Sequence, residues 1–122
     1  PAVNQVELHP YWPQPRQLQV DTELGIRTES WSPLGRAGAL FHDAVITGIA
    51  ADLGRTISQV ILRWHVQVGS IPVPKAATPS RQAENLDIFD FELAADQVAA
   101  ITALGQSDGR LSGSDPASHQ EF

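Results

Sequence analysis

Hydrophobic and polar positions along the chain follow two different patterns. A two-residue alternation predicts a strand at residues 2–8, and short apolar runs predict two further strands at residues 26–31 and 71–73. Apolar residues at helical spacing, with suitable boundary residues, predict helices at residues 17–24, 43–53, 57–68, 79–89 and 95–104. The predicted order is therefore strand, helix, strand, helix, helix, strand, helix, helix.

Capping residues support three of these helix boundaries. Asp43, Thr56 and Thr78 each stand where a helix N-cap is expected. Thr56 and Gln59 fit a capping box, and Pro79 occupies the first helical position after Thr78. Residues 106–122, rich in Gly, Ser, Asp and Pro, are expected to form an irregular tail.

Strands that alternate with helices indicate parallel βαβ units. Three parallel strands leave two open edges, and a barrel of eight such units needs roughly 250 residues. We therefore interpret the 122 residues as one partial α/β-barrel domain, about half of a barrel. Because the chain has no methionine and opens directly on a strand pattern, we also expect its beginning to be missing.

Composition narrows the class of protein. Apolar residues make up 42% of the chain, which is enough for a hydrophobic core. A formal net charge of −6 favours neither a nucleic acid nor an anionic membrane as partner. The sequence has no cysteine, no membrane-spanning apolar run and no signal-peptide pattern, so we expect a cytoplasmic protein.

The histidines do not suggest a metal site. The sequence has four of them, at positions 9, 42, 65 and 119, without the spacing of metal ligands. His65 lies inside a predicted helix between Trp64 and Val66, which favours a packed histidine over a ligand. The sequence also lacks the G-x-G-x-x-G pattern of a Rossmann unit.

Two basic residues flank the start of the predicted helix at residue 79. Lys75 and Arg81 stand beside Thr78 and Ser80, just after a short strand. Free N–H groups at a helix N-terminus favour an anion, and barrel enzymes often bind phosphate in such a place. From the residues alone, two interpretations stay open: a phosphate site, or two solvated surface bases.

Four ordered motifs resemble the aldo-keto reductase family. They are NQVELHPY at residues 4–11, SWSPLG at 30–35, VILRWH at 60–65, and IPVPK at 71–75 followed by Arg81 and ENL at 84–86. Within the family the chain looks most like the bacterial diketogluconate-reductase-like enzymes. The resemblance implies the C-terminal half of a TIM (β/α)8 barrel, comprising strands six to eight with their helices. It also implies an NADPH-dependent oxidoreductase that reduces aldehydes or ketones to alcohols.

The resemblance assigns residues to the nicotinamide and pyrophosphate of NADPH. Gln5 stands where the family hydrogen-bonds the nicotinamide carboxamide; its alternative is a polar residue on the barrel axis. Trp31 stands where an aromatic ring stacks on the nicotinamide; its alternative is core packing. Ser32, Leu34 and Arg36 follow in the loop that covers the pyrophosphate in this family.

The adenosine end of the cofactor is assigned in the same way. Lys75 and Arg81 match the residues that hold the 2′-phosphate, and Glu84 and Asn85 match the contacts to adenine. Ala76 departs from the family, where a serine or threonine usually donates to that phosphate. This departure weakens the preference for NADPH over NADH.

The family's catalytic tetrad has no counterpart in the sequence. In the family a tyrosine acts as general acid with a lysine, an aspartate and a histidine, all from the first half of the barrel. The one tyrosine here, Tyr11, belongs to the motif at residues 4–11. We therefore predict no catalytic residue in this chain and no activity for these 122 residues alone.

Partners and alternatives follow from the same resemblance. The whole enzyme would act on a small carbonyl compound, which Trp12, residues 35–40 and the tail would contact. The chain would pair with the missing N-terminal half of the barrel or with itself. The alternative is a non-catalytic truncated half-barrel or a structural nucleotide-binding module.

Overall fold

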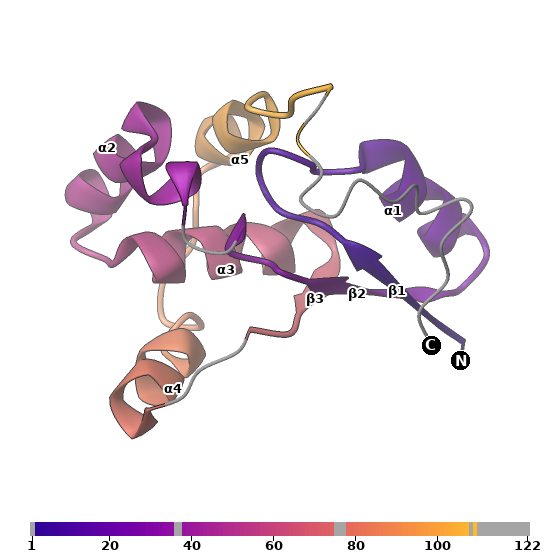
Figure 1. Ribbon diagram of the computed structural model, residues 1–122, viewed down its shortest axis with the longest axis horizontal. Helices are drawn as coiled ribbons and strands as arrows, with labels where there is room; N and C mark the ends of the chain where they lie inside the picture. Colours follow the sequence, from indigo (N-terminus) through magenta and orange to yellow (C-terminus); the bar gives the residue numbers. More distant parts are fainter. Residues whose placement is uncertain (1, 36–37, 75–77, 108, 110–122) are drawn as a thin grey trace.

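The computed structural model describes residues 2–35, 38–74, 78–107 and 109. The strands β1 (Val3–Glu7), β2 (Arg27–Trp31) and β3 (Ser70–Pro72) form one parallel sheet in the order β1-β2-β3 (Figure 1). The helices are α1 (Pro15–Glu23), α2 (Ala44–Leu53), α3 (Ile57–Val68), α4 (Pro79–Leu86), α5 (Ala95–Thr102) and a 3-10 helix, η2 (Ala39–His42). The predicted order of strands and helices is confirmed. Among the elements of the described residues, only η2 was not predicted.

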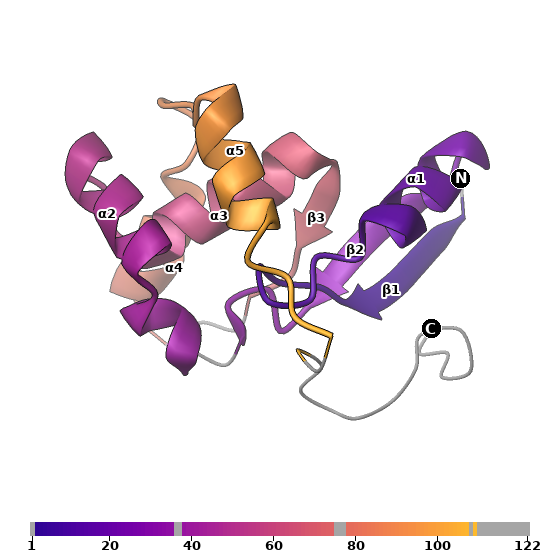
Figure 2. The same ribbon diagram turned by 90° about the horizontal axis from the view of Figure 1, so that it is seen from above.

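Helices cover the two faces of the sheet to different extents. Thr28, Ser30 and Ser70 point to one face and are buried. On that face Thr28 donates to Asp21 of α1 and Ser70 bonds to His65 of α3, so these two helices cover it. Figure 2 shows α1 lying along β1 and β2. On the opposite face Gln5 and Ile71 are exposed and Glu29 and Trp31 are partly exposed, whereas Glu7 at the end of β1 is buried.

The core lies between the sheet and the helices α2, α3 and α5. Its largest member, Trp64 of α3, is fully buried, and its indole Nε1 donates to Thr102 Oγ1 of α5 at 3.0 Å. Apolar side chains from every layer surround it: Val6, Leu8, Leu40, Ile46, Ile49, Ala50, Val60, Ile61, Leu93 and Ile101. Their burial follows the helical spacing from which α2, α3 and α5 were predicted.

The predicted N-caps are confirmed. The Asp43 carboxylate accepts from the backbone N–H groups of Val45 and Ile46 at the start of α2. Thr56 and Gln59 form the expected capping box, with both bonds at 3.1 Å. Helix α4 ends at Leu86, three residues earlier than predicted. Contacts from α3 hold the segment that follows, as described below.

The described strands do not close into a barrel. Each outer strand pairs on one side only within the described residues, and three strands are fewer than half of the eight in a closed barrel. Among the described residues, no single helix is long and apolar enough to cross a membrane. Helices α2 and α3 meet that test only together, and they are bent by 96° at their junction.

Candidate functional site

The carboxyl ends of the three parallel strands meet at one edge of the sheet. In α/β folds, ligands bind at this edge, in the loops that follow the strands. Glu7, Trp31 and Pro72 are the last residues of β1, β2 and β3. The structure thus brings the segments after residues 7, 31 and 72 to one end of the molecule, as Figure 1 shows for the strand ends.

Gln5 and Trp31 lie on the less covered face of the sheet. Gln5 is exposed and pairs in register with Glu29, and its Nε2 donates to Glu29 Oε1 at 2.9 Å. Trp31 lies two residues after Glu29 and therefore points to the same face. Its ring is partly exposed at the end of β2. A planar ligand above this face could contact both side chains.

The segment after Trp31 makes a tight turn. Ser32 has a φ of 49° and its carbonyl accepts from Gly35 N at 2.9 Å. Leu34 packs against the hydrophobic core and so anchors the turn to it. Arg36, which was expected to belong to this loop, lies outside the described residues.

A buried carboxylate and a buried histidine lie at the end of β1, Glu7 as its last residue and His9 just beyond it. Glu7 is 2% exposed and His9 1% exposed, and Glu7 Oε2 lies 2.9 Å from His9 Nε2. Burial lowers the pKa of His9, and the Glu7 carboxylate opposes that effect. Among the described residues, Nδ1 of His9 has no hydrogen-bond partner. Sequence reasoning placed His9 in a turn and missed this pair.

Tyr11 serves as a link between β1 and α2. Its hydroxyl donates to Asp43 Oδ2 at 2.8 Å. Burial and the Asp43 carboxylate raise the pKa of Tyr11 to about 12. The phenol therefore stays protonated at neutral pH, and its proton is held by a helix cap. Trp12 follows in the same turn, where its backbone pairs with that of His9.

The start of α4 carries the other predicted phosphate ligands. Thr78 Oγ1 accepts from Arg81 N at 3.3 Å and lies 3.3 Å from Ser80 Oγ. The Arg81 side chain is exposed beside this cap. The structure thus brings Thr78, Ser80 and Arg81 together. Lys75 and Ala76 lie outside the described residues.

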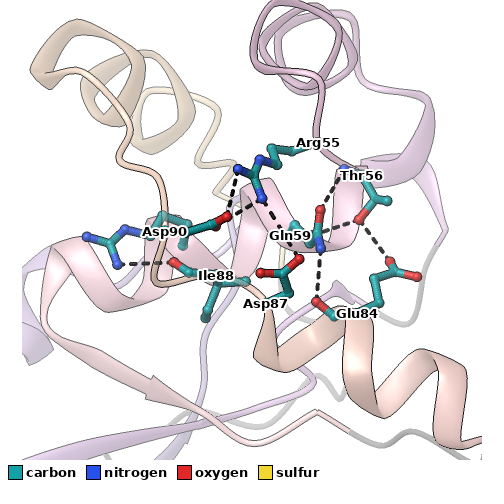
Figure 3. A network of polar contacts seen from close by, with 8 residues as sticks. Arg55, Thr56, Gln59, Glu84, Asp87, Ile88 and Asp90 are labelled. Atoms are coloured by element: carbon teal, nitrogen blue, oxygen red, sulfur yellow. Dashed lines mark hydrogen bonds and ion pairs between the residues drawn. The ribbon is translucent and has the colours of Figure 1, made fainter.

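Glu84 and Asn85 lie one turn further along α4. Glu84 Oε2 accepts from Thr56 Oγ1 at 2.8 Å, and the Glu84 carbonyl accepts from Gln59 Nε2 at 3.1 Å (Figure 3). The capping box at the start of α3 therefore holds Glu84 in place. Asn85 is partly buried and lines a cavity of about 720 Å³ between β3, α3 and α4, together with apolar residues such as Leu62 and Leu86.

Two arginines hold the segment after α4 against α3. Arg55 donates to both carboxylate oxygens of Asp90, at 3.0 and 3.1 Å (Figure 3). Its guanidinium lies 4.6 Å from the centre of the Phe91 ring. Arg63 Nη1 donates to the Ile88 carbonyl at 3.2 Å. These contacts explain why α4 ends before the predicted boundary.

Two buried polar groups make contacts that the sequence analysis did not predict. Asp21 of α1 is 2% exposed and accepts from Gln17, Thr28 and, more weakly, Asn4, which ties α1 to the sheet. His65 is fully buried, as predicted for a packed histidine, but it bonds to three segments through a network described below. Among the described residues, no group of three His, Cys, Asp or Glu side chains could hold a metal ion.

Comparison with known proteins identifies the family. The model of the aldo/keto reductase family matches residues 1–106, and the chain belongs to this family. It is 54% identical over 122 residues to 2,5-diketo-D-gluconic acid reductase B of Corynebacterium sp., covering 100% of this chain and 43% of that protein. It is 44% identical to methylglyoxal reductase DkgA of Escherichia coli, covering 95% and 42%.

Solved structures agree with this assignment. The crystal structure of Gox0644 without ligand superposes with a TM-score of 0.89 at 45% identity, covering 100% of this chain and 44% of that one. A mutant of Gox0644 in complex with NADPH gives a TM-score of 0.88 over 99% of this chain. The chain thus spans less than half the length of the relatives that it matches.

The expected fold class needs a correction. The prediction of the C-terminal half of a TIM barrel is wrong as a description of this fold. The family match occupies residues 1–106, the N-terminal portion of the chain, and the solved relatives are covered over 44% of their length. These findings support the interpretation that the chain corresponds to a portion of the barrel, without its assignment to the C-terminal half. Every βα unit of a barrel repeats one hydrophobic pattern, so that pattern does not fix a unit's place in the ring.

Proposed function

We propose that this chain is the cofactor-binding part of an aldo-keto reductase that reduces aldehydes or ketones to alcohols with NADPH. The observation that carries the proposal is the placement of Gln5 and Trp31 on the less covered face of the sheet. When bound, NADPH supplies the hydride that reduces the carbonyl carbon. The substrate would be a small carbonyl compound, with Trp12 in the turn after β1 as a contact.

The chain's own residues would bind and orient the nicotinamide. The Gln5 amide, fixed by Glu29, would bond to the carboxamide, and the Trp31 ring would stack on one face of the nicotinamide. Stacking on a fixed ring leaves the other nicotinamide face toward the substrate, which is a positioning effect. Ser32, Leu34 and Arg36 would cover the pyrophosphate.

The first turns of α4 would hold the adenosine end. Lys75 and Arg81 would bind the 2′-phosphate beside the cap of α4, where the helix dipole also favours an anion. Glu84, held by Thr56, and Asn85 would contact the adenine. Ala76 replaces a donor to the phosphate, so selection of NADPH over NADH would depend on the two bases.

The general acid of the reaction would come from outside these 122 residues. Tyr11 is the one tyrosine of the chain, and its hydroxyl donates its hydrogen bond to Asp43. A pKa of about 12 also makes Tyr11 a weak proton donor at neutral pH. The alternative function is a nucleotide-binding module without catalysis. It is favoured by the open sheet of the described residues.

The test compares two exposed arginines in the purified chain. Arg81→Ala should weaken NADPH binding by about 10- to 150-fold, as expected for loss of a charge-assisted contact, and NADH binding much less. Arg27→Ala, which changes an exposed arginine at the opposite end of the sheet, is the matched control. Equal losses for both cofactors would show that Arg81 does not bind the phosphate. A chain that binds neither nucleotide would contradict the proposed function.

A further inference from the structure

We propose that His65 is a positioning residue: a one-way chain of hydrogen bonds through its ring fixes the turn after β2. This inference rests on the proposed function, because that turn carries Ser32 and Leu34, two of the proposed cofactor contacts. His65 itself touches no ligand site, since it lies inside α3 and is fully buried.

The His65 ring of α3 bonds to the turn after β2 and to β3, and through Ser70 it is connected to β2. Its Nε2 lies 2.9 Å from the Pro33 carbonyl oxygen in the turn after β2. Its Nδ1 lies 3.2 Å from Ser70 Oγ at the start of β3. Ser70 Oγ in turn bonds to Ser30 Oγ in β2. All of these residues are buried, so water cannot replace a missing partner.

The donor and acceptor in each of these hydrogen bonds follow from the Pro33 carbonyl oxygen at one end of the series. A carbonyl oxygen can only accept, so Nε2 must carry the proton that bonds to Pro33. Burial lowers the pKa of His65 to about 4, so the ring is neutral at pH 7 and Nδ1 is an acceptor. Ser70 must therefore donate to Nδ1, and Ser30 must donate to Ser70. One tautomer of His65 thus sets the orientation of both hydroxyl groups.

The turn needs such a support. Ser32 adopts a φ of 49°, a region that a residue with a side chain rarely occupies, and Gly35 follows at 61°. Pro33 lies between them and has no N–H with which to stabilise the turn. The His65 contact binds the buried Pro33 carbonyl, which would otherwise be an unsatisfied acceptor. Only a donor at the Nε2 position can make this bond.

Two substitutions separate the two ring nitrogens. A glutamine amide extends about as far as Nε2, whereas an asparagine amide extends only about as far as Nδ1. His65→Gln therefore retains a donor for Pro33, and His65→Asn retains a partner for Ser70 only. Amide hydrogen exchange of the segment 32–35 should accelerate at least tenfold in His65→Asn and less than threefold in His65→Gln. Exchange in α5 is the internal control for global stability.

The outcomes distinguish this inference from the proposed function. If both variants exchange in segment 32–35 like the wild type, His65 does not position the turn. If His65→Asn loosens the turn and also weakens NADPH binding about tenfold, while His65→Gln restores both, the inference stands. A loosened turn with unchanged NADPH affinity would overturn the link to the cofactor. Failure of the wild-type chain to bind NADPH would contradict the proposed function instead.

A second measurement does not depend on either variant folding. Nitrogen-15 NMR of the wild-type His65 ring at pH 7 should show a protonated Nε2 and an unprotonated Nδ1. The opposite tautomer, or a doubly protonated ring, would overturn the proposed order of donors and acceptors from Ser30 through Ser70 and His65 to Pro33.

Discussion

Gly35 is the residue of the turn after β2 at which both backbone and space are restricted. Its φ is 61°, and an added Cβ would lie 2.6 Å from Leu40 Cδ1. Gly35→Ala should therefore lower the free energy of unfolding by about 2–4 kcal/mol, from backbone strain and overpacking together. Urea denaturation measures this loss.

Gly25 provides the matched control. It also has a positive φ, 70°, but nothing lies within 4 Å of an added Cβ. Gly25→Ala should cost only the backbone strain, about 1–2 kcal/mol. Equal losses in the two variants would show that contact with Leu40 contributes nothing to the requirement for glycine at position 35.

Trp31 is the residue on which proposed nicotinamide stacking depends. Trp31→Ala should weaken NADPH binding and remove most of the quench of tryptophan fluorescence on adding NADPH. The chain has three tryptophans, of which Trp64 is fully buried in the core. If the quench is as strong in the variant, Trp12 or Trp64 is the reporter and the stacking role is wrong.

At the scale of elements, Asp43 joins the start of α2 to the turn after β1. Its carboxylate accepts from two backbone N–H groups and from the Tyr11 hydroxyl. Asp43→Ala should lower the free energy of unfolding by about 2–3 kcal/mol, the sum of a lost cap and a lost hydrogen bond.

Tyr11→Phe separates the two contributions of Asp43. It removes the hydroxyl and leaves the cap, so it should cost about 1 kcal/mol. Both variants are measured by urea denaturation under the same conditions. A Tyr11→Phe loss as large as that of Asp43→Ala would mean that the cap contributes nothing to the stability of α2.

At the scale of the whole molecule, exposed apolar surface and open edges should drive association. Leu86 is 73% and Phe89 70% exposed beside the cavity that borders β3. Within the described residues, the outer edge of β3 has no paired strand. An unpaired edge next to apolar surface is a site for pairing with another chain. Sedimentation of the purified chain should therefore show self-association, or association with a complementary part of a barrel.

The same polypeptide should not reduce aldehydes. A positioned general acid typically contributes about 10²–10⁴-fold to such a reaction, and Tyr11 is bound to Asp43. An assay of NADPH oxidation with a small aldehyde tests this expectation. A monomer that turns over substrate would contradict it, and His9 and Tyr11 would then be the first residues to substitute.

The sequence by itself determined the order of the elements and most of their boundaries. These features depend on local interactions: apolar spacing within a helix, and caps such as Asp43 and Thr56 that bond to residues two or three positions away. Motifs of a few residues likewise sufficed to identify the family that the comparisons confirm.

Only the tertiary structure decided which side chains meet. Tyr11 bonds to Asp43 across 32 positions, Thr56 to Glu84 across 28, and His65 to Pro33 across 32. Such pairs depend on strand register and on the packing of helices against the sheet, which no local pattern contains. For the same reason the sequence did not fix the place of these strands in a barrel. Every βα unit repeats the same local pattern, and closure of a barrel depends on contacts between strands far apart in the chain.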